Sequence, residues 1–285
     1  MKSPFSSASV WLWLSIAAAL VAVAGSVVSL TVKDFYANLT PAFLPQALAQ
    51  DIANLAVVSP LWLVLAVLAL RGSLRAYLLW LGVLTFTVYN YVIYTFSIPF
   101  GPLFLVWVAV LGMSIYALIG GGAAVDYATV AAAFVNRRAI QVTAWFLIVT
   151  AVLFGFLWLS EDVPALLSNT RPQSTVDMAL PTNPVHILDL AFFLPAAILT
   201  GVMLLRKKAS AYTFAPPLIV FLILTGIPIL ITPVVQSALG DVAAWGIFVP
   251  IGTLTVLLTA LLVGLMATMQ PQTVTNHSNR PKRRK

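Results

Sequence analysis

Eight apolar stretches, each about long enough to cross a bilayer, dominate this sequence of 285 residues. A bilayer core needs about 20 apolar residues per helix. Charged residues make up only 8% of the chain, against about 25% in a soluble domain. We therefore predict an all-α, polytopic transmembrane bundle. Its expected spans are residues 10–32, 51–70, 76–98, 102–121, 139–159, 185–205, 212–235 and 243–268.

We expect one transmembrane bundle over residues 1–270, followed by a basic cytoplasmic tail, 271–285, without fixed structure. The first apolar run has an alternative interpretation as a signal peptide, with Lys2 as its positive end. Against this, the run exceeds the roughly 7–15 residues usual for the apolar part of such a signal. We interpret it as an uncleaved span.

The distribution of basic residues predicts the orientation. If the N-terminus is cytoplasmic, 13 of the 15 Lys and Arg residues lie inside, and only Lys33 and Arg171 lie outside. Cytoplasmic loops carry such an excess of positive charge. We expect a multi-pass protein of the bacterial inner membrane with both termini cytoplasmic. The tail residues Arg280 to Lys285 are expected to lie against anionic lipid, at about 1 kcal/mol per basic residue.

Composition also excludes several classes of site. The chain has no cysteine, which removes disulfides, thiolate metal sites and cysteine nucleophiles. One histidine outside the tail, His186, cannot supply bis-histidine haem ligation within the chain or a second histidine for zinc. We expect no cofactor and no metal. The net charge of +7 follows the predicted topology, so we do not expect nucleic acid as a partner.

Residues 51–77 resemble residues 186–212 at an offset of 135, with nine of 27 positions identical. The matches include Pro60 with Pro195 and the ends of both spans, although apolar helices also resemble one another by composition. The overlay suggests a duplication of residues 1–135 as residues 136–270, which is four spans plus four. Two four-span halves run in the same direction, related by an axis along the membrane normal, as in some transporters.

Two polar pairs correspond in this overlay. Asp51 falls on His186, and Asn54 falls on Asp189. Each pair is spaced three residues apart, so it projects from one face of its helix. The alternatives are structural: either carboxylate could be a first-turn acid stabilised by the helix dipole, and His186 could be a satisfied interfacial histidine.

A third polar group follows in the third span, where Asn90 and Tyr94 share a face. Tyrosines near a helix end often form an aromatic belt, but an intramembrane Asn usually bonds across helices. We predict that the His186 and Asp189 face points into the bundle, toward Asp51 and Asn54 of the second span and Asn90 or Tyr94 of the third, because a carboxylate facing lipid is penalised. The candidate binding residues are Asp51, Asn54, Asn90, Tyr94, His186 and Asp189.

The stretch PTNPVHILDL at residues 181–190, together with Gln50-Asp51, Arg71-Gly72-Ser73 and Tyr89-Asn90-Tyr91, resembles a family of uncharacterised bacterial multi-pass membrane proteins. The resemblance covers most of residues 45–235 and implies an inner-membrane location but no activity. Within the motif, Asn183 is a favoured N-cap and Pro184 a favoured first helical residue.

The favoured functional hypothesis is a non-catalytic binding protein, sensor-like or transporter-like, with an outward-facing polar pocket for a small polar ligand or a proton. One alternative is a membrane-embedded enzyme that acts on a lipid or isoprenoid head group, with His186 and Asp189 as an acid–base pair. Another is an accessory subunit whose polar residues are packing contacts. The sequence leaves the oligomeric state open.

Overall fold

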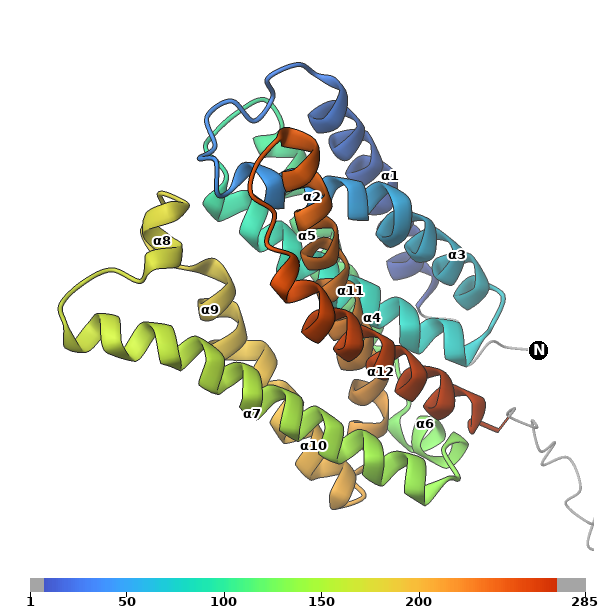
Figure 1. Cartoon of the computed structure of the whole chain (residues 1–285). Helices are drawn as coiled ribbons and strands as arrows, with labels where there is room; N and C mark the ends of the chain where they lie inside the picture. Colours follow the sequence, from blue (N-terminus) through green and yellow to red (C-terminus); the bar gives the residue numbers. More distant parts are fainter. Residues whose placement is uncertain (1–7, 271–285) are drawn as a thin grey trace, which may run out of the picture.

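The computed structural model describes residues 8–270 and confirms the all-α prediction, with eight candidate membrane spans in this part of the chain (Figure 1). The basic tail predicted over 271–285 lies outside the described residues. The helices are α1 (Ser9–Thr31), α2 (Leu44–Ala53), α3 (Ser59–Leu70), α4 (Leu74–Ser97), α5 (Phe104–Ala123), α6 (Tyr127–Ala133), α7 (Arg137–Leu167), α8 (Gln173–Asp177), α9 (Pro184–Leu188), α10 (Leu194–Leu205), α11 (Ala209–Leu239) and α12 (Phe248–Ala267).

Two spans contain a π-helical turn in their interior. Asn54–Val58 joins α2 to α3, and Asp189–Phe193 joins α9 to α10, so that each forms one continuous span. Each turn ends two residues before a proline, Pro60 or Pro195. A proline ring inside an α-helix clashes with the carbonyl four residues earlier, and the wider π turn moves that carbonyl aside. The two prolines therefore coincide with a local widening of their helices.

Several helices extend beyond their predicted limits. The second span begins at Leu44 and not at residue 51, with Pro45 in its first turn. The fifth continues to Leu167 and not 159, so it includes Glu161 and Asp162. The predicted limits were placed at the first charged residue. Charge makes burial in lipid costly, but it does not interrupt the backbone hydrogen bonds of a helix.

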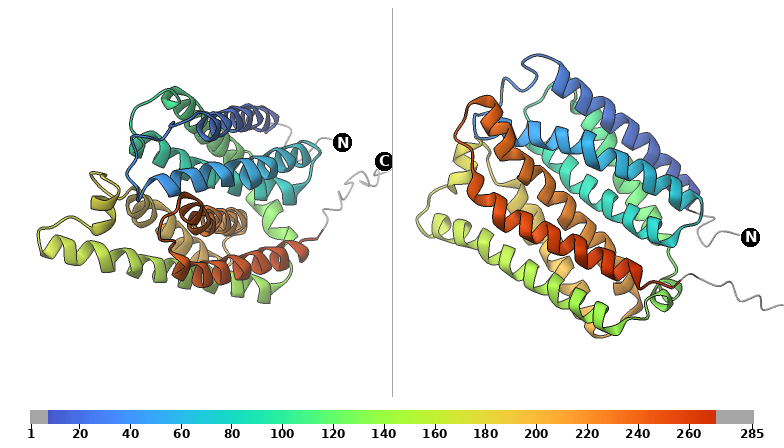
Figure 2. Two further views of the ribbon diagram at one scale, coloured as in Figure 1. Left: turned by 45° about the horizontal axis from the view of Figure 1, so that its top comes forward. Right: turned by 45° about the vertical axis from the view of Figure 1, so that its right-hand side comes forward.

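The bundle is organised around α4 and α11, which pack against each other along the centre. Helices α3 and α5 pack on α4, whereas α10 and α12 pack on α11; α1 packs on α3 and α5, and α7 on α10. Helix α4 is the most enclosed, with 72% of its apolar stretch buried, and α12 the least, with 6%. Helix α12 therefore lies on the outside of the bundle (Figure 2).

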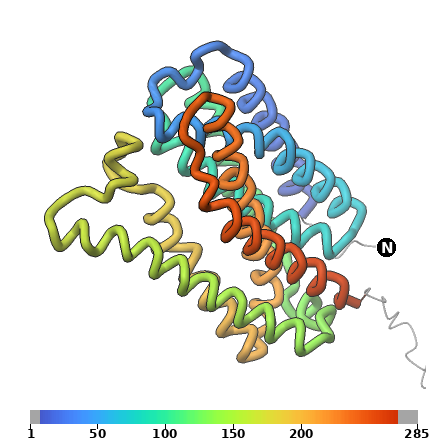
Figure 3. Tube along the Cα trace, in the orientation of Figure 1, coloured from blue at the N-terminus to red at the C-terminus, as the bar shows by residue number. Residues whose placement is uncertain are grey.

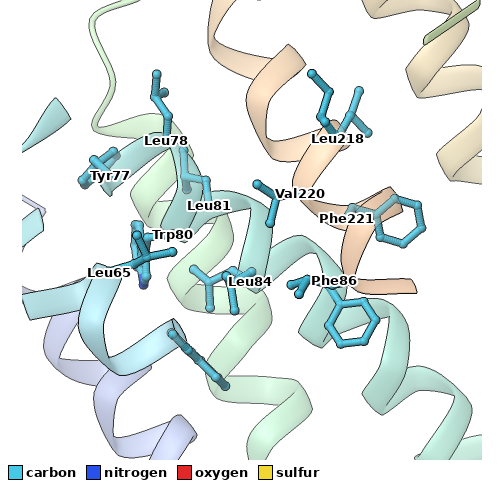
Figure 4. Close-up of a cluster of buried hydrophobic side chains, with 14 of the residues drawn as sticks. Leu65, Tyr77, Leu78, Trp80, Leu81, Leu84, Phe86, Leu218, Val220 and Phe221 are labelled. Atoms are coloured by element: carbon cyan, nitrogen blue, oxygen red, sulfur yellow. The ribbon is translucent and has the colours of Figure 1, made fainter. Parts of the chain in front are cut away.

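The core lies where these central helices meet. Figure 4 shows Leu84 and Phe86 of α4 on the side of Val220 and Phe221 of α11, and Trp80 of α4 next to Leu65 of α3. The Trp80 indole N–H donates to the Ser15 hydroxyl of α1 at 2.9 Å, so the one polar atom of this large side chain is satisfied. The core therefore ties the N-terminal helices to the centre of the bundle.

The linkers gather at the two ends of the bundle (Figure 3). One end, called here the α8 end, carries residues 32–43, 98–103, 168–183 and 240–244. The opposite end, called the α6 end, carries residues 71–73, 124–136 and 206–208. At the α6 end, Met269 pairs with Phe134 in an antiparallel bridge, and its carbonyl accepts from Arg75 at 2.5 Å. The candidate polar residues belong to the half of the bundle near the α8 end.

Candidate functional site

Asp51 is enclosed by hydroxyl groups. Its Oδ1 accepts from Ser26 at 2.8 Å and from Tyr94 at 2.9 Å. Its Oδ2 accepts from Ser29 and from Tyr36, each at 2.6 Å. The residue is only 2% exposed. Because an ionised carboxylate offers about four acceptor sites, these four donors satisfy Asp51 and offset much of the cost of its burial.

Tyr36 lies in the linker between α1 and α2, outside the spans. Burial is the main cause that raises the pKa of Tyr36 above its ordinary value, and the Asp51 carboxylate raises it further. The hydroxyl therefore stays protonated and remains a donor. The α1–α2 linker is thereby fixed to α2 by a hydrogen bond that the sequence analysis did not anticipate.

Asn54 extends the same network toward α4. Its Oδ1 accepts from Gln50 at 3.0 Å and from Asn90 at 3.4 Å, and its Nδ2 donates to Ser26 at 3.5 Å. The structure thus brings together four of the six predicted residues. We call them, with the hydroxyl donors and Gln50, the Asp51 network: Ser26, Ser29, Tyr36, Gln50, Asp51, Asn54, Asn90 and Tyr94.

The other two predicted residues, His186 and Asp189, lie on the sixth span beside α7. Asn183 caps this helix as predicted: its side chain accepts from the backbone N–H of Val185 and His186, with Pro184 at the first helical position. His186 and Asp189 are both buried, at 4% and 8% exposure. Both side chains are therefore enclosed by the protein, but their hydrogen-bond and ion-pair partners lie on α7 and are not the residues predicted on α2 and α4.

Trp158 of α7 connects these two residues. Its ring stacks on the His186 imidazole with centroids 4.5 Å apart, and its indole N–H donates to Asp189 Oδ2 at 2.8 Å. His186 Nδ1 lies 2.9 Å from Asp162 Oδ1, and its Nε2 lies 3.7 Å from Glu161. The structure therefore pairs His186 with Asp162, whereas the enzyme hypothesis had required an acid–base pair of His186 with Asp189.

The two groups meet at one cavity of about 430 Å³ between α2, α4, α7, α9, α11 and α12. Asn90 and Tyr94 of the Asp51 network line it, and so do Gln50, Trp158 and Asp189; the rest of the wall is mainly apolar. Asp51, Asn54 and His186 are not among its lining residues, so they lie behind the wall. The predicted pocket was polar, and the cavity found here is apolar with a local polar region.

Sequence reasoning missed the donors that surround the carboxylates. Ser26 and Ser29 are three residues apart in an apolar helix and so share one face. This spacing could have identified a polar face on the first span. Trp158 and Tyr36 gave no comparable signal, because aromatic residues near helix ends are usually belt residues. Within residues 8–270, no group of three His, Asp or Glu side chains could hold a metal ion.

Comparison of the chain with protein-family models, with curated proteins and with solved structures finds no match.

Proposed function

We propose that this integral membrane protein is a non-catalytic binding bundle, sensor-like or transporter-like, whose cavity takes one small amphipathic molecule. The proposal rests on the size and the wall of the cavity. Its volume of about 430 Å³ falls within the roughly 300–1,000 Å³ typical of small-molecule sites, which are largely apolar with a few placed polar groups. Gln50, Asn90 and Asp189 supply such groups here.

The polar region of the wall is fixed before any ligand arrives. Asn90 is bonded to Asn54, Tyr94 to Asp51 and Asp189 to Trp158. Side chains that are already ordered lose little conformational entropy on binding. The network therefore supports the role of a preformed binding surface, with the apolar part of the ligand against α11 and α12.

The experiment uses three probes with the same 12-carbon chain, namely 1-dodecanol, dodecyltrimethylammonium and dodecyl phosphate, titrated into protein in a non-ionic detergent. We expect saturable binding of at least one probe and its loss in Thr225→Trp, which places a large side chain in the cavity. Val256→Trp is the control, because Val256 is 68% exposed on α12 and does not line the cavity. Binding that Thr225→Trp leaves unchanged, or no saturable binding of any probe, would contradict the proposal.

The proposed setting is the bacterial inner membrane with the α6 end in the cytoplasm. The resemblance of residues 181–190 to a bacterial family supports the location, and the 13 basic residues assigned to one side support the orientation. The cavity would then open toward the outer half of the membrane, and the tail 271–285 would lie against anionic lipid.

A four-plus-four duplication is part of the proposal. The two π-helical turns, Asn54–Val58 and Asp189–Phe193, stand at the same offset of 135 residues as the sequence overlay (189 − 54 = 135). The packing supports it too: α3–α4 and α4–α5 in the first half correspond to α10–α11 and α11–α12 in the second, with α4 against α11 at the centre.

Reporter fusions test both the orientation and the duplication. A phosphatase active only in the periplasm should be silent when fused after Arg75 or after Arg206, and active when fused within residues 168–183. Equal results at Arg75 and Arg206 are required if the halves run in the same direction. Activity at both positions would reverse the orientation, and activity at only one would exclude parallel halves.

A further inference from the structure

The cavity contains a single charged side chain. Among its lining residues in the described part of the chain, Asp189 is a carboxylate, and none is Lys, Arg or His. The His186 imidazole behind it is held by Asp162 and approached by Glu161. Two carboxylates of α7 therefore flank the imidazole, so no positive charge is left over to neutralise Asp189 at the cavity wall.

Aromatic rings surround the same region. Tyr89 stands edge-on to Phe221 with centroids 5.1 Å apart, and Phe154 lies 5.9 Å from Trp158. All four rings line the cavity together with Asp189. Ring faces attract cations, most strongly when water is excluded. A carboxylate among several rings is the chemistry that recognises an ammonium group, whereas a phosphate or carboxylate ligand would meet repulsion from Asp189.

The two buried carboxylates differ in what they leave open. Asp51 receives four hydroxyl donors and does not reach the cavity. Asp189 receives the Trp158 indole N–H on Oδ2, interacts with Tyr89, and lines the cavity. The amide side chains of Gln50 and Asn90, which line it too, each direct their NH₂ group to Asn54. Their carbonyl oxygens remain as acceptors for a donor ligand.

We infer that the cavity selects a ligand that carries an ammonium group, held by Asp189 and the aromatic rings, with its apolar part against α11 and α12. This inference rests on the proposed binding function and specifies the chemical class of its ligand. The ammonium group has two sources, a membrane amphipath or a water-soluble amine, and the probes distinguish them.

The test compares affinities for dodecyltrimethylammonium, 1-dodecanol and dodecyl phosphate in the same non-ionic detergent, with tetramethylammonium as the probe without a chain. We expect the cationic probe to bind about tenfold more tightly than the alcohol, and the phosphate to bind most weakly. Saturable tetramethylammonium binding would indicate a water-soluble ligand. A requirement for the chain would indicate a membrane amphipath.

Asp189→Asn should remove the preference for the cation while alcohol binding remains, because the shape of the side chain is kept and its charge is lost. The matched control is Asp241→Asn, which removes an exposed charge from the α11–α12 linker and leaves the cavity wall intact. Equal binding of cation and alcohol to the unmodified protein, sensitive to Thr225→Trp, would overturn the inference and leave the binding function standing. Absence of any Thr225-sensitive binding would remove both.

Discussion

Asp51→Ala is expected to destabilise the protein by about 2–4 kcal/mol, because it removes the common acceptor of four buried hydroxyl groups. Ser26, Ser29, Tyr36 and Tyr94 converge on this one carboxylate from α1, the α1–α2 linker and α4. Losing it leaves donors unsatisfied in an environment without water and opens a cavity at the contact of three elements. The measurement is the midpoint of thermal unfolding in detergent.

Two variants distinguish the loss of the hydrogen-bond acceptor from the loss of the charge and from the loss of any carboxylate. Asp51→Asn keeps an acceptor oxygen and should cost clearly less than Asp51→Ala. Asp241→Ala removes an exposed carboxylate at the same end of the bundle and should leave the midpoint nearly unchanged. If Asp51→Ala and Asp241→Ala unfold at the same temperature, the hydroxyl groups do not depend on Asp51.

Gly82→Val is the second substitution with a large expected effect, about 1–3 kcal/mol of destabilisation. A Cβ added at Gly82 would lie 2.5 Å from the Val220 Cβ and 3.0 Å from the backbone Cα of Pro217. Both neighbours belong to α11, so relief requires the central helices α4 and α11 to separate. Small residues allow helices to approach closely in membranes. At Gly82, α4 and α11 make such a close approach.

The matched control for this substitution is Gly112→Val on α5, where an added Cβ meets nothing within 4 Å. Valine is a better helix former than glycine by a few tenths of a kcal/mol, so this variant should be neutral or slightly stabilising. Unfolding midpoints of both variants in the same detergent decide the matter. An equal change in the two would mean that α4 and α11 do not pack tightly at Gly82.

The sequence predicted the number and type of spans because length and hydropathy alone determine both. The predicted site grouped Asp51, Asn54, Asn90 and Tyr94 with His186 and Asp189, and the hydrogen-bond network of the structure joins only the first four. The partners of His186 could not be predicted from the sequence. A spacing of three residues places His186 and Asp189 on one face, but α7 decides what that face meets, and Trp158, Asp162 and Glu161 are all on α7.

The sequence also failed to predict the limits of the helices and the chemistry of the cavity. Span ends were inferred from charge, and the extension of α7 past Glu161 shows that a charged residue can continue a helix beyond the apolar region. The polar pocket was inferred from polar residues on inward faces. Asp51 and Asn54 bond to other side chains instead of lining a space, so the wall around the cavity is largely apolar.

The π-helical turns before Pro60 and Pro195 have a consequence for how related sequences align. A π turn is one residue added to an α-helix, and here the added residue relieves the clash that the following proline creates. Neither change is favourable alone: the proline without the insertion strains the helix, and the insertion without the proline has no strain to relieve. Proline and insertion therefore form one mutational unit, and aligned relatives that lack the proline should show a one-residue gap in the same turn.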